Sequence, residues 1–290
     1  MSLNKKQFET INKIINELNL KKNDKIHLSL DLMKIFLNLK IKKMSFLKFS
    51  EVILKLIRLR IGKNGLIAVP VFNFNCINTG KFNRIKTPGE TGAFGNFLLK
   101  KYYKKRSYHP INSFLIFGKN SSRLINHEHE NCHGADSIWK YFIKENFKLV
   151  TIGHHYVRSF TIVHYLEKLS GVKYRFDKLV EIQYTNFTGR KKNRFEFFAR
   201  KLDICKHSTI TFKCDKIFFK KKIFKFFKMN RLISFNLNLK KASRIILNDL
   251  KRKNTTLVSF SNNKNKKHNV LDFSNVIKLE EKYQKLKRQN

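Results

Sequence analysis

Two periodicities of apolar residues alternate along about the first 180 residues of the chain. Apolar side chains that recur every three or four positions predict helices over 8–18, 49–57, 94–102 and 137–142. Short continuous apolar runs predict strands at 25–30, 66–72, 114–117 and 147–153. Because strands and helices alternate, the sequence predicts an α/β fold in which helices flank a mixed or mostly parallel central sheet.

Local signals mark where some of these elements begin and end. Ser45 is placed to cap the helix that follows it, and Ser159 to cap a later helix that runs to Gly171. Pro70 donates no hydrogen bond, so its strand is expected to end there or to lie at an edge of the sheet. The asparagines, glycines and proline of residues 73–92 predict a loop.

The chain is expected to form one α/β domain over residues 1–260. The part from about 8 to 180 carries the motifs described below, whereas 185–260 is more basic and divergent. Within it, KKKIFKFFK (220–228) mixes lysine with aromatic residues, as segments that contact RNA or membrane surfaces do. We favour an ordinary strand or helix with a lysine-coated outer face. Residues 261–290 predict a linker followed by a charged terminal helix.

Charge is the most unusual property of the composition. The 290 residues include 62 Lys and Arg against 20 Asp and Glu, a formal net charge of +42. Lys, Asn, Ile and Phe are all abundant and share AT-rich codons, so a codon bias would raise lysine on any solvated surface. We therefore interpret the charge as compositional and expect no nucleic-acid partner. A polycationic partner would need a locally acidic pocket on such a surface.

The sequence also bears on the cellular compartment. No apolar run reaches the length of about 18 residues that indicates a membrane span, and the N-terminal segment spaces its apolar residues as a helix does. Four cysteines follow no repeating spacing, which indicates free thiols: Cys76, Cys132, Cys205 and Cys214. The sequence predicts a cytoplasmic protein without a membrane span.

One pair of residues has the spacing of a catalytic dyad. His164 and Glu167 lie three positions apart in a predicted helix, so their side chains share a face. A carboxylate can orient an imidazole through one ring nitrogen and leave the other as a general base, for which an unperturbed pKa of about 6.5 is suitable. The same spacing is typical of a surface ion pair, and spacing alone favours that interpretation.

Other polar segments carry weaker signals. The loops TPGETG (87–92) and RSYHPINS (106–113) flank a predicted helix, where glycines and a helix N-terminus can approach a phosphate, although an ordinary turn explains them equally well. HEHENCH (127–133) holds four zinc-ligand side chains but has no second ligand pair, so we expect a polar loop and no metal. Neither a P-loop nor a G-x-S-x-G nucleophile motif is present.

The order and spacing of these motifs resemble the aminoglycoside 3-N-acetyltransferase family, also called the antibiotic N-acetyltransferases. DKIHLSL (24–30) and IGKNGLIAVPVFNF (61–74) are similar to its first two strand motifs. The most specific match is KTPGETGAFGNFL followed by RSYHPINSFLIFG (106–118). HGADSIWKYF, KLVTIG and FTIVHYLE complete the series. The resemblance spans about residues 8–180 and is faint beyond them.

This resemblance implies an α/β acetyltransferase, distinct from the GNAT fold, that moves acetyl from acetyl-CoA to a sugar amine. His164 matches the catalytic histidine of the family, and Glu167 matches its carboxylate partner. His164 would then take a proton from the attacking amine, directly or through water, without an acyl-enzyme.

Five further residues match motif positions that the resemblance places on the coenzyme side, where hydroxyls and a guanidinium suit phosphate and pantetheine oxygens. They are Ser29, Arg106, Ser107, His109 and Ser113. The chain also departs from the family pattern. Leu66 stands where a threonine is expected, His133 replaces a phenylalanine, and Ser29 is what remains of a serine pair. None of these departures removes the expected base.

The acceptor is the least determined part of the reaction. Aminoglycosides are polycations, and few carboxylates are available here to hold one, for example Asp31, Glu90, Glu128, Glu130, Asp136 and Asp177. We therefore expect a neutral or anionic amino sugar, such as a surface-glycan or nucleotide-linked sugar. The alternatives are an aminoglycoside 3-N-acetyltransferase that confers antibiotic resistance and, in a different class, a basic nucleic-acid-associated protein. A homodimer is compatible with the sequence.

Overall fold

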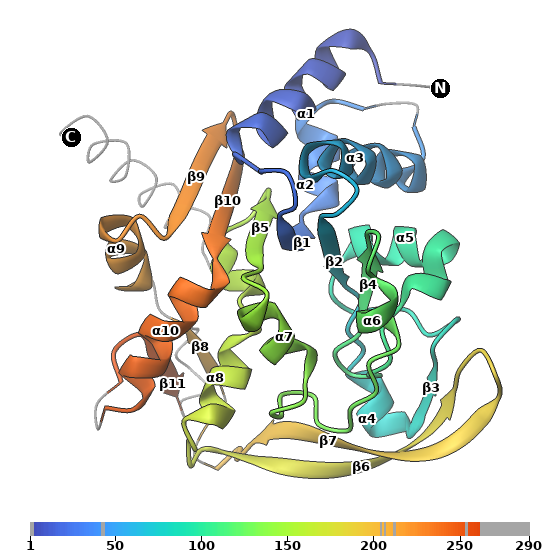
Figure 1. The fold of residues 1–290 in the computed structure, drawn as a ribbon, viewed down its shortest axis with the longest axis vertical. Coiled ribbons are helices and arrows are strands. Elements are labelled where there is room, and N and C mark those ends of the chain that lie inside the picture. The colour runs from blue at the N-terminus through green and yellow to red at the C-terminus, as the bar shows by residue number, and fades with distance from the viewer. Residues whose placement is uncertain are drawn as a thin grey trace.

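The protein is described by a computed structural model over residues 3–41, 44–203, 205, 207–210, 213–252 and 255–261. Its main sheet has the strand order β4-β2-β1-β5-β10-β9 (Figure 1). These strands are β1 (Lys25–Leu30), β2 (Leu66–Pro70), β4 (Phe114–Phe117), β5 (Lys148–Ile152), β9 (Phe224–Met229) and β10 (Leu232–Asn238). β1 pairs in parallel with β2 and β5, whereas β4, β10 and β9 join by antiparallel pairing. The predicted mixed sheet is confirmed.

Helices cover both faces of this sheet. One face packs against α1 (Lys5–Glu17), α2 (Leu32–Asn38), α3 (Phe46–Ile61) and α5 (Ala93–Tyr102). The other packs against α6 (Ser122–Ile125), α7 (Ile138–Lys144), α8 (Val163–Leu169), α9 (Lys213–Lys220) and α10 (Leu239–Leu250). Alternate residues of β2 serve the two faces, since Leu66 and Ala68 belong to one core and Ile67 and Val69 to the other. This explains why the strands read as continuous apolar runs.

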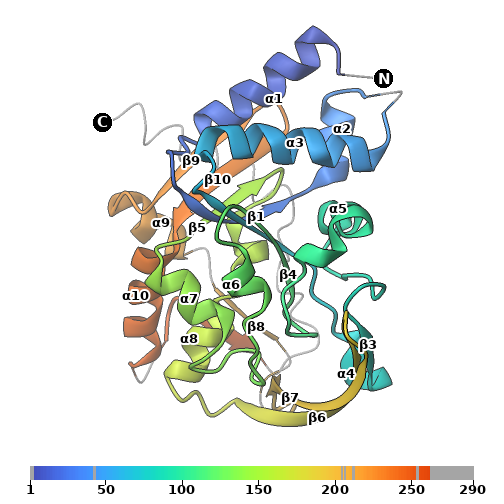
Figure 2. The same ribbon diagram turned by 45° about the vertical axis from the view of Figure 1, so that its right-hand side comes forward.

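A long hairpin forms a second structural layer beside the main sheet. β6 (Arg175–Thr185) pairs antiparallel with β7 (Arg190–Arg200), and β3 (Lys81–Asn83) pairs parallel with β6. The hairpin curves from α8 to β3 and α4 (Asn75–Thr79) in both views (Figures 1 and 2). Its inner side chains pack in a small separate core of Cys76, Phe82, Tyr108, Ile111, Val180, Ile182, Tyr184 and Phe195. The remaining strands, β8 (His207–Ile210) and β11 (Val258–Ser261), pair antiparallel with each other.

Most of the predicted boundaries agree with the structure. Ser45 caps α3, because its hydroxyl accepts a hydrogen bond of 3.3 Å from the backbone N–H of Lys48. Pro70 is the last residue of β2, which lies between β4 and β1 and is therefore not an edge strand. The segment KKKIFKFFK spans the end of α9, a turn and most of β9. Its lysines Lys220, Lys221, Lys222 and Lys225 are exposed, so the segment forms ordinary secondary structure with lysines on the outside, as the favoured interpretation expected.

Two boundaries were predicted wrongly. Residues 73–92 are not loop throughout, because they contain α4 and β3. Ser159 does not cap a helix: it ends the 3₁₀ turn Tyr156–Ser159, and α8 begins four residues later, at Val163. The Ser159 hydroxyl instead donates to the hydroxyl of Ser29 at 2.8 Å. The prediction rested on serine being a common N-cap residue. The Ser159 side chain is held instead by Ser29, a partner that is distant in the sequence.

The expected linker and terminal helix at 261–290 lie outside the described residues, apart from Ser261. Among the helices of the described ranges, none combines the length and apolar character needed to cross a membrane.

Candidate active site

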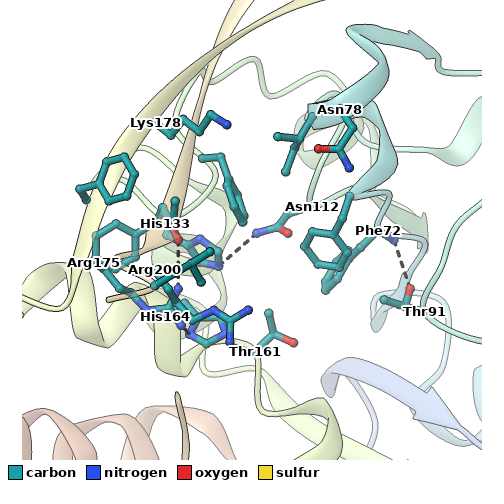
Figure 3. A pocket seen from close by; sticks show the side chains of 17 residues that line it. Phe72, Asn78, Thr91, Asn112, His133, Thr161, His164, Arg175, Lys178 and Arg200 are labelled. Atoms are coloured by element: carbon teal, nitrogen blue, oxygen red, sulfur yellow. Dashed lines mark hydrogen bonds between the residues drawn. The ribbon is translucent and has the colours of Figure 1, made fainter. Parts of the chain in front are cut away.

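A cavity of about 710 Å³ lies where α8 meets the hairpin, the segment after β2, the turn before β4 and the loop between α6 and α7 (Figure 3). Aromatic and basic side chains dominate its wall. The lining residues are Phe72, Phe74, Ile77, Asn78, Thr91, Asn112, His133, Thr161, His164, Arg175, Phe176, Lys178, Phe197, Phe198, Ala199, Arg200 and Leu202. Segments far apart in the sequence therefore build one site.

The predicted dyad of His164 and Glu167 is formed in this wall. The two residues lie on one face of α8, and Nδ1 of His164 is 2.8 Å from Oε2 of Glu167. Nδ1 also lies 3.0 Å from a guanidinium nitrogen of Arg175, which can only donate, whereas a carboxylate oxygen can only accept. In the tautomer that carries its proton on Nδ1, this proton is donated to Glu167 and Nε2 is the basic nitrogen. The His164 side chain is 25% exposed, whereas that of Glu167 is fully buried. The geometry is that of an oriented imidazole rather than a solvated surface ion pair.

Two residues beyond the helix complete this arrangement. The Tyr174 hydroxyl donates to Oε1 of Glu167 at 2.9 Å, and Nε of Arg175 lies 2.7 Å from Oε2. Arg175 also donates to the carbonyl of Phe198 at 3.0 Å, which fixes its guanidinium against β7. Both oxygens of the buried carboxylate are thus satisfied, as a buried charge requires.

Electrostatics favour an ionised Glu167 and a neutral His164. Burial alone would raise the pKa of Glu167, but hydrogen bonds from His164 and Tyr174 and the charge of Arg175 outweigh it and lower the pKa. Burial lowers the pKa of His164, and the charges of Arg175 and Arg200 act in the same direction against the opposing effect of Glu167. A neutral imidazole at neutral pH can accept a proton.

A second polar pair, Asn112 and His133, lies beside the dyad in the cavity wall (Figure 3). Nδ2 of Asn112 donates to Nε2 of His133 at 3.1 Å, and Nδ1 of His133 lies 3.0 Å from the thiol sulfur of Cys132. The rings of His133 and His164 are nearly perpendicular, with centroids 5.6 Å apart. Burial lowers the pKa of His133 well below its usual range, so this ring is also neutral.

Sequence reasoning did not single out several of these residues for the site. Asn112 lies inside RSYHPINS and His133 inside HEHENCH, so each had a signal, but neither was linked to His164. Tyr174 and Arg175 carry no motif at all. They reach Glu167 because the chain reverses after α8, and that reversal is a tertiary feature.

Four of the five residues expected on the coenzyme side are buried behind the cavity wall. Arg106 has no exposed surface, and its guanidinium donates to the carbonyls of Val71 and Thr87 and to the hydroxyl of Ser113. The Ser113 hydroxyl also donates to the Val71 carbonyl, at 2.9 Å. These contacts hold the loop after β2 to the start of β4.

The other two buried residues behave in the same way. The Ser107 hydroxyl accepts from the backbone N–H of Phe114 at 2.9 Å. His109 contacts the Glu130 carbonyl through Nε2 and accepts from two backbone N–H groups through Nδ1. Neither residue lines the cavity. The polar atoms of RSYHPINS that were expected to face the coenzyme therefore shape the loop that carries Asn112.

Ser29, the fifth residue, lies near the end of β1 and is partly exposed. Its hydroxyl accepts a hydrogen bond from the Ser159 hydroxyl, whose oxygen lies 2.9 Å from Nε2 of His154. Thr161, two positions after Ser159, lines the cavity. This hydroxyl cluster thus adjoins the segment that leads to His164.

The histidine-rich segment 127–133 divides between separate environments. The rings of His127 and His129 stack with centroids 5.0 Å apart, whereas His133 turns toward Asn112 and Trp139. Within the described ranges, no group of three or more His, Cys, Asp or Glu side chains is arranged to hold a metal ion.

With this geometry established, the chain can be compared with known families. A family model described as aminoglycoside 3-N-acetyltransferase matches residues 46–246. The chain belongs to this family. Membership confirms the resemblance inferred from the motifs and the predicted acyltransferase class, and enzymes of the family use acetyl-CoA as the acetyl donor. No curated protein sequence matches the chain.

Solved structures agree on the fold. An aminoglycoside acetyltransferase, AAC(3)-IIb, superposes with a TM-score of 0.67 at 14% identity, covering 86% of this chain and 98% of that one. AAC-IIIb, solved as a binary complex with CoASH, gives 0.64 at 14% identity, with 82% and 93% covered. The YokD protein from Bacillus subtilis gives 0.61 at 17% identity, with 82% and 96% covered. At such identities the similarity establishes the fold, and residue roles must rest on this chain's own geometry.

Proposed function

We propose that this family member transfers acetyl from acetyl-CoA to an amino group of an amino sugar, with His164 as the general base. The observation that carries the proposal is the oriented, neutral imidazole of His164 in the wall of a large cavity, backed by Glu167, Tyr174 and Arg175. The position of AAC-IIIb among the structural neighbours, with its CoASH, supports the choice of donor.

In the proposed reaction, the acceptor amine attacks the thioester carbonyl carbon while Nε2 of His164 takes one of its protons. The tetrahedral intermediate collapses with cleavage of the carbon–sulfur bond, and the imidazolium returns the proton to the leaving thiolate. Glu167 stabilises the transient imidazolium through Nδ1. The products are the acetamide and the free thiol of the coenzyme.

Direct transfer fits the cavity better than a cysteine-linked intermediate does. The thiol nearest His133 belongs to Cys132, which is fully buried, and burial raises its pKa to about 12. A protonated, inaccessible thiol is a poor nucleophile. The transfer therefore proceeds without an acyl-enzyme in this proposal.

We assign the coenzyme to the side of the cavity at Thr161, which Ser29 and Ser159 adjoin without lining the cavity themselves. Their hydroxyls lie at the end of β1 and lead through Thr161 to His164, so a thioester entering there would reach the base. Arg106, Ser107, His109 and Ser113, which are buried, are assigned as positioning residues. They hold the adjoining loop instead of contacting the coenzyme.

The charge of the cavity supports a neutral or anionic acceptor. Among the described residues that line it, three are cationic and none is a carboxylate. A polycation would be repelled by such a wall. An aminoglycoside drug, the alternative acceptor suggested by the family name, is therefore the second candidate.

The deciding experiment combines binding and turnover. Calorimetric titration with acetyl-CoA at moderate salt should show saturable binding, and acetylation of amino sugars should be detected by mass spectrometry. His164→Ala should retain coenzyme binding and lose about 100-fold or more in kcat. If the variant folds, binds acetyl-CoA and keeps full kcat, His164 is not the base.

Absence of coenzyme binding, together with salt-sensitive binding of duplex DNA, would instead favour the nucleic-acid alternative. Repeating the titration at raised salt separates the two, because contacts to phosphates weaken steeply with salt whereas a specific coenzyme site should persist.

A further inference from the structure

The positive charge of the cavity is arranged asymmetrically. Of its three cationic lining residues, Arg175 is bound to Glu167 and to the Phe198 carbonyl and so serves the dyad. Lys178 and Arg200 come from opposite strands of the hairpin and line the same cavity (Figure 3). Arg200 lies beside His164, so Lys178 is the cation placed to contact a part of the acceptor distant from the base.

The hairpin turns its carboxylates away from Lys178. Side chains alternate along a strand, and Lys178 is in phase with Val180 and Ile182, which face the body of the protein. Asp177 and Glu181 occupy the opposite phase, and Glu196 is paired with Leu179 on that same side. The acidic residues of β6 and β7 therefore lie on the face opposite Lys178.

Those carboxylates are also bound elsewhere. Asp177 lies 2.6 Å and Glu196 3.9 Å from Nζ of Lys168 on α8, and Glu181 pairs with Lys192 at 2.5 Å. Their charges are satisfied on the side of the hairpin away from Lys178. Arg175, Phe198 and Arg200 share the phase of these carboxylates and do line the cavity, whereas the carboxylates and their lysine partners are not among its lining residues.

On the opposite wall, the carboxylate of Glu90 is held by Asn73 and by the backbone N–H of Asn75. It is adjacent to the lining residue Thr91 but does not itself line the cavity. The polar groups on this side, such as Asn78 and Thr91, are uncharged.

Arg200 adds positive charge next to the base. It pairs with Arg175 across the hairpin, and its charge contributes to the lowered pKa of His164. Figure 3 places Arg200 beside His164, with Lys178 farther out along the wall. An acceptor bound at His164 would therefore have one cation near its amine and another farther along the molecule.

Aromatic rings provide the remaining wall. Phe74 and Phe197 approach from the two sides with ring centroids 6.4 Å apart, and Phe72 and Phe198 lie deeper. Ring faces of this kind pack against sugar or base rings without adding charge. The cavity combines flat apolar surfaces with a cation, Lys178, that lies away from the base, and these features suit a phosphorylated sugar.

We propose that Lys178 binds a phosphate group of the acceptor, at a distance from the amine that reaches His164, and thereby selects a phosphorylated amino sugar against a polycationic one. This inference rests on the acetyltransferase function proposed above and names its substrate class. Lysine and arginine are the side chains that bind phosphate through charge-assisted hydrogen bonds. Cations near the reacting amine also favour its neutral, nucleophilic form.

The test compares acceptors that differ in charge. Wild-type protein with acetyl-CoA is assayed with glucosamine, glucosamine 6-phosphate, UDP-glucosamine and sisomicin, at moderate salt. We expect kcat/KM to be higher by about 10-fold or more for one of the phosphorylated acceptors than for glucosamine, and lowest for sisomicin. Whichever of glucosamine 6-phosphate and UDP-glucosamine has the higher kcat/KM then shows whether the phosphate belongs to a sugar phosphate or to a nucleotide-linked sugar.

A charge-reversed variant identifies the residue. Lys178→Glu should lower kcat/KM for the preferred phosphorylated acceptor by about 10-fold and leave that for glucosamine within about threefold. Lys191→Glu, an exposed lysine of the same hairpin outside the cavity, is the matched control and should change neither. The same variants are titrated directly with the phosphorylated acceptors in the presence of CoA.

The outcomes separate this inference from the proposed function. Suppose that glucosamine or sisomicin is acetylated, that kcat/KM is no higher for the phosphorylated acceptors, and that Lys178→Glu does not change the ratio of kcat/KM between phosphorylated acceptor and glucosamine. The proposed acceptor class is then wrong, while the acetyltransferase function stands. If neither turnover nor binding of the phosphorylated acceptors is seen although acetyl-CoA binds, the inference also fails. If acetyl-CoA does not bind, the proposed function itself fails.

Discussion

Two polar segments of the chain, one around His164 and one at RSYHPINS, look equally rich in chemistry but fold into opposite roles. Around α8, Glu167 is buried and its charge is used to orient an imidazole that reaches a cavity. In RSYHPINS, Arg106 and Ser113 are buried, and both donate to the backbone carbonyl of Val71, while Arg106 also donates to the Ser113 hydroxyl. Polar residues at the spacing of a motif thus do not reveal their role in the folded protein. A structural role is shown by hydrogen bonds that end on the protein's own backbone, and a reactive role by a polar atom that reaches the cavity.

The sharpest way to break this comparison is to remove the charge behind the imidazole. Glu167→Gln should lower kcat by roughly 100-fold. The neutral amide has no negative charge, so it neither holds the Nδ1 proton of His164 as firmly nor stabilises the positive charge of the imidazolium that forms during the reaction. Steady-state kinetics measure the loss, and a thermal melt checks that the buried Arg175 still folds into place. An unchanged kcat in a folded variant would reduce Glu167 to a structural residue.

The opposite segment should respond in stability instead of in chemistry. Arg106→Ala leaves the Val71 and Thr87 carbonyls without their buried donor and opens a cavity, which should lower the free energy of unfolding by about 3 kcal/mol or more. Urea unfolding measures this loss. The exposed neighbour Lys105→Ala is the control and should stay within about 0.5 kcal/mol.

Arg106→Ala also tests the assignment of the coenzyme. If the variant keeps wild-type stability and loses only affinity for acetyl-CoA, Arg106 contacts the coenzyme and its burial has been misinterpreted.

A smaller effect is expected at the edge of the dyad. Tyr174→Phe removes one hydrogen bond to Oε1 of Glu167 and leaves Arg175 in place, so kcat should fall by about fivefold. Tyr165→Phe, on α8 itself, is the matched variant and should keep kcat within about twofold. Equal losses in both variants would point to a general packing effect instead of support for the carboxylate.

The pH profile is the mildest probe. Burial and the charges of Arg175 and Arg200 lower the pKa of His164, so the acidic limb of kcat/KM should lie below the usual value of about 6.5, with activity rising as pH rises through it. Glu167 opposes that shift, so Glu167→Gln should move the limb to still lower pH. Movement toward higher pH would contradict the assigned base.

The comparison also shows how far sequence patterns reach. The strands β1, β2, β4 and β5 were predictable because a strand buried on both faces reads as a continuous apolar run. The dyad was predictable because residues three apart on a helix share a face. The misplaced cap at Ser159 shows the limit, since a serine before a helix is indistinguishable in sequence from one that bonds Ser29.

The sequence by itself determined the family, the α/β alternation and the identity of the dyad, because these depend on local periodicity and motif order. The tertiary structure alone decided which polar groups serve the cavity. Arg175 and Tyr174 reach Glu167 only after the chain reverses, and Lys178 shares a wall with Arg200 only because β6 pairs with β7 in one register. Hydrogen-bond partners and strand register are long-range relations, and no local pattern encodes them.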